Sequence, residues 1–185
     1  MTGFAAACQL RQRAAENGFF VECVCLSASI IDGMLRIGLI LKHQLDIGSR
    51  DIPLELIIQR EGERGLSERQ IYLRAAEEGV IPQFLLERLQ EAYDQRNRVI
   101  HQYIISRITT SELLDAGITY ERLISDVSKY VEILESEQIR QGAGMTVTGP
   151  RPTIGYICEI ARGKHGSEVL ADILISRPKG DATQS

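Results

Sequence analysis

Hydrophobic residues recur at intervals of three and four along most of the chain, which is the spacing of one face of an α-helix. The helix at 19–44 carries apolar residues at nearly every rotational position, so we expect it to lie in the middle of a bundle. The pattern predicts an all-α fold of long antiparallel helices. The predicted helices span residues 4–16, 19–44, 67–79, 84–106 and 120–141.

Residues that commonly begin and end helices mark the boundaries around the third helix. Ser67, followed by Gln70 three positions later, matches a capping box, in which the two side chains satisfy backbone N–H groups of the first turn. Gly79 is expected to end this helix. Pro82 suits the first turn of the next one, because proline needs no N–H partner there.

Two stretches between the helices are less regular. Residues 48–63 suit either a helix or an extended segment, and a glycine-rich turn closes them. Further along, Thr110 or Ser111 can cap a short helical turn over 112–117. We expect that turn to be a separate element from the helix at 120–141.

Composition divides the chain into three segments. Residues 1–141 predict the helical bundle, and the Gly- and Pro-containing residues 142–152 predict a linker. Residues 153–185 predict a small C-terminal appendage with a disordered tail from Pro178. Two short helices are expected in the appendage, and its β-branched residues leave a β-hairpin as the alternative.

Charge and hydropathy limit the classes of partner. A net charge of −4 argues against bulk electrostatic capture of nucleic acid, so an RNA site would have to be a local patch. Charged residues interrupt the apolar stretch at 19–41, which argues for a buried helix rather than a membrane span. The N-terminal residues do not match a secretory signal peptide, so we expect a cytoplasmic protein without membrane contact.

Cysteine spacing gives no support for a metal site. The chain has four cysteines, and Cys23 and Cys25 lack a second pair at the spacing of zinc ligands. We expect free thiols packed in the core of a protein from a reducing compartment, with no metal and no cofactor.

The octet RNRVIHQY at 96–103 contains the side chains best suited to catalysis. The Arg96 guanidinium can hold a phosphate with its planar fork, and the His101 imidazole can move protons near neutral pH. Five helical positions separate the two residues by about 140° around the axis. They can meet only through the long arginine side chain or through a helix break capped by Asn97. A looser arginine–histidine spacing recurs at Arg36 and His43, so spacing alone carries little information.

The octet resembles the signature of the HEPN superfamily, whose RNase-toxin branch carries the motif R-x4-H-x-Y. Arg96, Asn97, His101 and Tyr103 match each position of that motif, including the polar residue after the arginine. The long second helix and the further helix after the motif also resemble the bundle of that family. The resemblance covers the chain to about residue 141 and leaves out the C-terminal segment.

This resemblance implies a metal-independent endoribonuclease, acting as a toxin or a defence effector. The 2′-hydroxyl of the RNA would attack the adjacent phosphate, with His101 as general acid or base. Arg96 would stabilise the charge that builds on the phosphoryl oxygens. Asn97 would orient the pair by capping or hydrogen bonding, and Tyr103 would position the phosphate.

The resemblance also implies partners. One histidine cannot easily serve as acid and base in a single pass, and the family solves this with a homodimer that brings two motifs to one cleft. A nucleotidyltransferase-type antitoxin is a further expected partner, because in toxin relatives a tyrosine at the position of Tyr103 can receive AMP. Arg98 and Arg107 flank the motif as candidate contacts for the RNA backbone, and an ordinary solvated face is the alternative for both.

Two alternatives stay open from the sequence. Asp32 lies within the apolar second helix and is a candidate partner for Arg96, but the spacing favours its pairing with Arg36 four positions on. The octet can also serve structure alone, in which case the chain is a non-catalytic HEPN-like module for dimerisation or for binding a protein or nucleic acid.

Overall fold

The computed structural model describes residues 2–57, 65–102 and 108–143 of the chain, and all regular structure within these ranges is helical. The predicted all-α helical bundle is therefore confirmed for this part of the protein. The elements in chain order are α1 (Thr2–Glu16), α2 (Phe20–Ile47), the short 3-10 helix η1 (Leu54–Leu56), α3 (Glu68–Glu77), α4 (Gln83–Gln102) and α5 (Thr110–Gln141).

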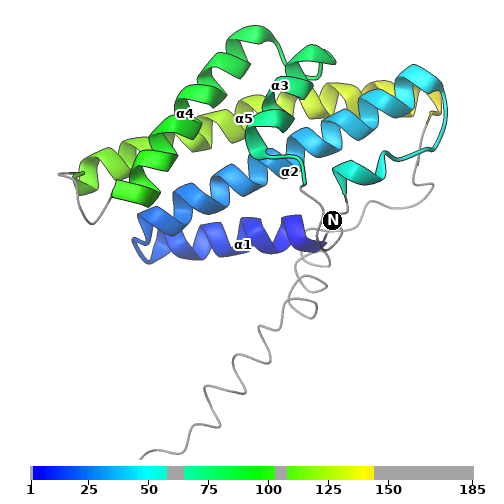
Figure 1. Cartoon of the computed structure of the whole chain (residues 1–185). Helices are drawn as coiled ribbons and strands as arrows, with labels where there is room; N and C mark the ends of the chain where they lie inside the picture. The colour runs from blue at the N-terminus through cyan, green and yellow to red at the C-terminus, as the bar shows by residue number, and fades with distance from the viewer. Residues whose placement is uncertain (1, 58–64, 103–107, 144–185) are drawn as a thin grey trace, which may run out of the picture.

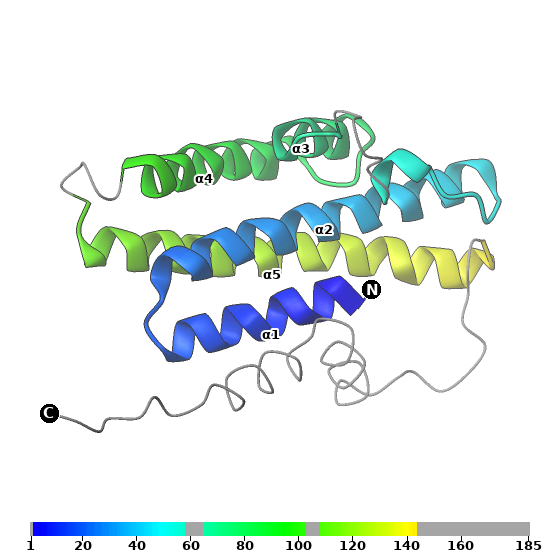
Figure 2. The same cartoon turned by 60° about the horizontal axis from the view of Figure 1, so that its bottom comes forward.

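Helix α2 lies at the centre of the bundle, as its apolar surface predicts. It runs beside α5, with α1 covering one side of this pair and α3 and α4 covering the other (Figures 1 and 2). By length and composition α2 could also cross a membrane, but 56% of its most apolar window is buried against other parts of the chain. Such burial is typical of a core helix.

The core lies between α2 and α5 and the two helices α3 and α4. Tyr72 of α3 and Tyr120 of α5 are its two largest fully buried side chains. The other large, fully buried side chains are aliphatic: Val24, Ile30, Ile31, Leu35, Leu39, Leu56, Ile71, Leu85, Leu89 and Leu123.

The local signals around α3 are confirmed. The Ser67 hydroxyl accepts from the backbone N–H of Gln70, and the Gln70 side chain accepts from the N–H of Ser67 in return. Gly79 follows the helix with a positive φ of 74°. The Pro82 carbonyl then accepts from the N–H of Leu85, which begins the first turn of α4.

The prediction of a separate turn at 112–117 is wrong. Thr109, rather than Thr110 or Ser111, caps a single helix of 32 residues, again through a capping box with Glu112. Gly117 does not interrupt it. A glycine inside a helix costs only about 1 kcal/mol relative to alanine, and the buried positions on either side, Ala116 and Tyr120, keep the helix against the core.

The other boundaries differ little from expectation. Helix α2 continues to Ile47, three residues beyond the predicted end, and Gly48 closes it in the left-handed conformation. The ambiguous stretch at 48–63 contains η1, and its residues 58–63 lie outside the described part of the chain. Most of the predicted linker and the whole C-terminal appendage at 153–185 also lie outside it.

Gly38 of α2 lies close to the side chain of Val80, and this contact gives a first prediction. A Cβ at this position would lie 2.6 Å from Cγ1 of Val80, which is itself buried. We expect Gly38→Ala to lower the free energy of unfolding by about 1–3 kcal/mol, measured by urea denaturation. Gly117→Ala is the matched control, since nothing lies within 4 Å of its added Cβ, and it should raise stability by up to about 1 kcal/mol. Equal effects in the two variants would contradict the proposed close contact.

Candidate functional site

Arg96 projects from α4 into an ion pair with Glu68. Glu68 is the first residue of α3, directly after the Ser67 cap, so the capping box fixes its backbone. Nη1 of Arg96 donates to Oε2 of Glu68, and the two side chains are only 14% and 18% exposed. No other ion pair among the described residues is as little exposed.

Two further contacts hold the Arg96 guanidinium. Its Nη2 donates to Oδ1 of Asn97 over 3.1 Å, and its Cζ lies 4.8 Å from the centre of the Tyr93 ring. Its Nε is buried and has no hydrogen-bond partner within the described ranges. The guanidinium is therefore fixed in orientation by α3 on one side and by its own helix on the other.

Glu68 has a second buried donor. The hydroxyl of the fully buried Tyr72, one turn further along α3, donates to Oε1 of Glu68. Burial raises the pKa of Tyr72, and the neighbouring Glu68 charge and hydrogen bond raise it further, so the phenol keeps its proton. Both oxygens of the Glu68 carboxylate thus have partners, which leaves it little freedom to turn away from Arg96.

Burial also affects the pKa values of Arg96 and of the Cys25 thiol near it. Burial lowers the pKa of Arg96, but the hydrogen bond and charge of Glu68 more than compensate, so the pKa is raised overall. On α2, burial raises the pKa of the Cys25 thiol, and nearby Arg96 opposes that rise. Arg96 is therefore charged, and residues from α2, α3 and α4 meet around it.

His101 lies in the last turn of α4 and is exposed to solvent. Helix α4 passes Asn97 without a break, which excludes the helix cap at Asn97, one of the two alternatives that the sequence left open. Asn97 acts instead by its hydrogen bond to Arg96, the other role expected of it. Because Asn97 and His101 are four residues apart, their side chains are neighbours on the helix surface. The described residues show no hydrogen bond or ion pair between Arg96 and His101, and Asn97 is the residue that lies next to both.

The remaining candidates in the motif region divide into two groups. Arg98 is exposed on α4, where it could reach a phosphate or simply face water. Tyr103 and Arg107 lie outside the described residues.

Asp32 does not support Arg96. Its Oδ2 accepts from Nε of Arg36 at 2.7 Å, which is the alternative that the sequence left open. Glu68 occupies the place beside Arg96 for which Asp32 was a candidate. This is a correction of the predicted site.

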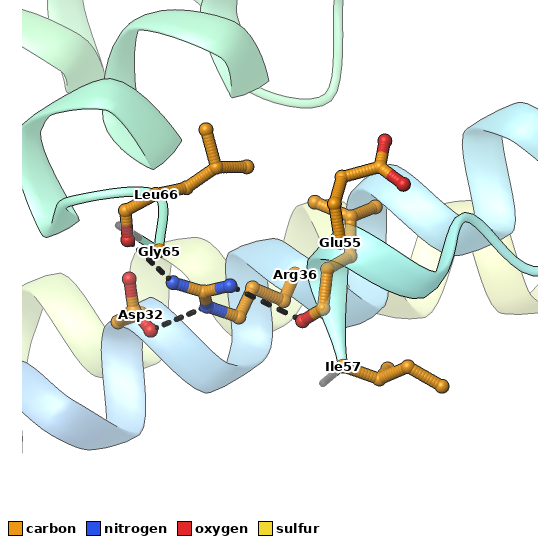
Figure 3. A pocket seen from close by; sticks show the side chains of 7 residues that line it. Asp32, Arg36, Glu55, Ile57, Gly65 and Leu66 are labelled. Atoms are coloured by element: carbon orange, nitrogen blue, oxygen red, sulfur yellow. Dashed lines mark hydrogen bonds and ion pairs between the residues drawn. The ribbon is translucent and has the colours of Figure 1, made fainter. Parts of the chain in front are cut away.

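Arg36 connects α2 to the segment that leads to α3. Arg36 Nη1 donates to the carbonyl of Leu56 over 3.2 Å, and its Nη2 donates to that of Leu66 over 3.0 Å (Figure 3). A cavity of about 240 Å³ lies beside these contacts, lined in part by Asp32 and Glu55. All three nitrogens of Arg36 are engaged, so this arginine serves the fold.

Sequence reasoning missed Glu68. Its one local signal is its place directly after the capping serine, and nothing local connects it to an arginine 28 positions later. As for metals, the described residues contain no group of three or more His, Cys, Asp or Glu side chains placed to hold an ion, and none of Cys8, Cys23 and Cys25 forms a disulfide with another described residue.

Comparison of the chain with protein-family models, curated proteins and solved structures finds no match. Arguments about function therefore depend on the residues of this chain and on the resemblance of its motif.

Proposed function

We propose that the protein is a metal-independent endoribonuclease of the HEPN type. The observation that supports the proposal is that Arg96 is charged and held by Glu68 and Asn97, and that Asn97 lies one helical turn before the exposed His101. A charged phosphate donor and an accessible imidazole on the same helix are the groups that cleavage of RNA without a metal requires.

The chemistry uses the 2′-hydroxyl of the substrate as the nucleophile. An imidazole takes the proton of that hydroxyl as its oxygen attacks phosphorus, and Arg96 stabilises the charge on the non-bridging oxygens. The bond from phosphorus to the 5′-oxygen breaks, and a second imidazole protonates the leaving oxygen. The products are a 2′,3′-cyclic phosphate and a 5′-hydroxyl.

The need for two imidazoles argues for a homodimer, in which each copy supplies one His101. Arg98, exposed on the same helix, is a candidate contact for the RNA backbone in that dimer. The protein would act in the cytoplasm as a toxin or a defence effector, with a nucleotidyltransferase-type antitoxin as a candidate regulator.

One observation favours a second function. Glu68 already neutralises Arg96 inside the bundle, as expected if the octet only stabilises the fold. The chain would then be a non-catalytic helical module that dimerises or binds a partner, and the same residues would affect assembly but no reaction.

Incubation with RNA in excess EDTA separates the two functions. We expect the parent protein to cut single-stranded RNA and to leave cyclic phosphate ends, while RNA with 2′-O-methyl groups throughout stays intact because it lacks the nucleophile. Intact RNA from a varied pool, with a folded protein at micromolar concentration, would rule out the nuclease and leave the binding module.

A further inference from the structure

The ion pair between Arg96 and Glu68 differs from the other ion pairs in its surroundings. Arg140 and Glu137 on α5, for example, form a pair with 71% and 35% of their side chains exposed, where water and ions screen the charges. Arg96 and Glu68 are largely shielded, so each strongly affects the other.

The pairing with Glu68 affects both the number of N–H donors that Arg96 has for a phosphate and the strength of its attraction for that phosphate. A guanidinium has five N–H groups, and only two of those of Arg96 have acceptors among the described residues, Glu68 and Asn97. Because Nε is buried, the second N–H groups of Nη1 and Nη2 are the candidate donors for an incoming anion. The adjacent carboxylate, however, repels that anion and offsets part of the attraction.

We infer that Glu68 is a positioning residue of the site, which keeps the Arg96 guanidinium oriented and limits its attraction for the RNA phosphate before reaction. This inference rests on the proposed ribonuclease function. A diester carries one negative charge in the substrate and gains charge as the 2′-oxygen attacks. A guanidinium held in a fixed orientation meets the charge that builds on the phosphoryl oxygens without having to reorganise, which favours the transition state over the bound substrate and is the condition for a high kcat.

The charge of Glu68 is tested by Glu68→Gln, which keeps one acceptor oxygen for Arg96, places an amide N–H₂ that can donate to the Tyr72 hydroxyl, and removes the charge. We expect KM for a short RNA to fall by about 3- to 10-fold, because the repulsion is gone, and kcat to fall by about tenfold or more, because the guanidinium is less firmly held. A purely structural role would lower the amount of folded protein without this opposite movement of binding and turnover.

Glu78→Gln is the matched control. It removes the same charge from the end of the same helix, where Glu78 pairs with Arg74 at 2.6 Å, away from the octet. Both its kinetic constants should stay within about twofold of the parent. Identical kinetics in the Glu68 and Glu78 variants, with an active parent, would overturn the role of Glu68 and leave the nuclease standing.

A second variant covers the case in which Glu68→Gln does not fold. Glu68→Asp keeps the charge but shortens the side chain by one methylene, so we expect an unchanged KM and a lower kcat. An unchanged kcat in this variant would overturn the inference. If the parent itself does not cleave RNA, the proposed function is wrong and the inference fails with it.

Discussion

Replacing His101 with alanine should abolish RNA cleavage and leave the protein folded. Loss of a general acid or base lowers the rate by about 100- to 10,000-fold. His101 is exposed in the last turn of α4, so its removal should change the free energy of unfolding by no more than about 0.5 kcal/mol. Initial rates on a fluorescent RNA in EDTA, together with urea denaturation, measure both effects.

The control for this experiment is His43→Ala. His43 belongs to the looser arginine–histidine spacing on α2, and its Nε2 lies 3.6 Å from Oδ2 of Asp51. This variant should cleave RNA at the rate of the parent, because the nuclease proposal gives His43 no part in the reaction. A His101→Ala protein that cuts RNA as fast as the parent would end the nuclease hypothesis.

The growth of cells that express these proteins compares His101→Ala with His43→Ala without purification. Expression of the parent or of His43→Ala should slow growth if the protein is a toxin, and expression of His101→Ala should not. Equal growth in all three cultures, at equal protein levels, would argue against a toxin that acts through His101.

Sequence predicted those features of the fold that depend on nearby residues. The capping box at Ser67 and Gln70 is confirmed because both partners lie within one helical turn. The central position of α2 was also predictable, since a helix that is apolar nearly all round must be covered on several sides.

The features that the sequence did not predict depend on contacts that form only in the folded chain. Gly117 weakens a helix locally, but the burial of Ala116 and Tyr120 against the core outweighs that local cost, and no pattern within the segment reveals it. The partner of Arg96 was also beyond local reasoning. Asp32 and Glu68 are both plausible carboxylates in the sequence, and only the packing of α3 against α4 decides between them.

Replacing Arg96 with alanine should destabilise the protein more than any other single loss of an arginine in the described bundle. Glu68 would keep only Tyr72 as a partner and would remain a largely buried charge without compensation. Breaking such a pair costs about 3–5 kcal/mol, which urea denaturation measures directly. Arg88→Ala is the control, since Arg88 is 40% exposed in its pair with Asp126 and its loss should cost no more than about 1 kcal/mol.

Because Arg96→Ala lowers stability, its loss of activity alone cannot establish a role in catalysis, and Arg96→Lys is needed beside it. A lysine keeps a positive charge for Glu68, so most of the stability should return, but its ammonium cannot bond Glu68 and Asn97 with one planar group. We expect a folded protein whose cleavage rate stays at least about tenfold below the parent. Full activity in Arg96→Lys would mean that only charge matters at this position, and a small stability change in Arg96→Ala would mean that the ion pair with Glu68 is not closed in solution.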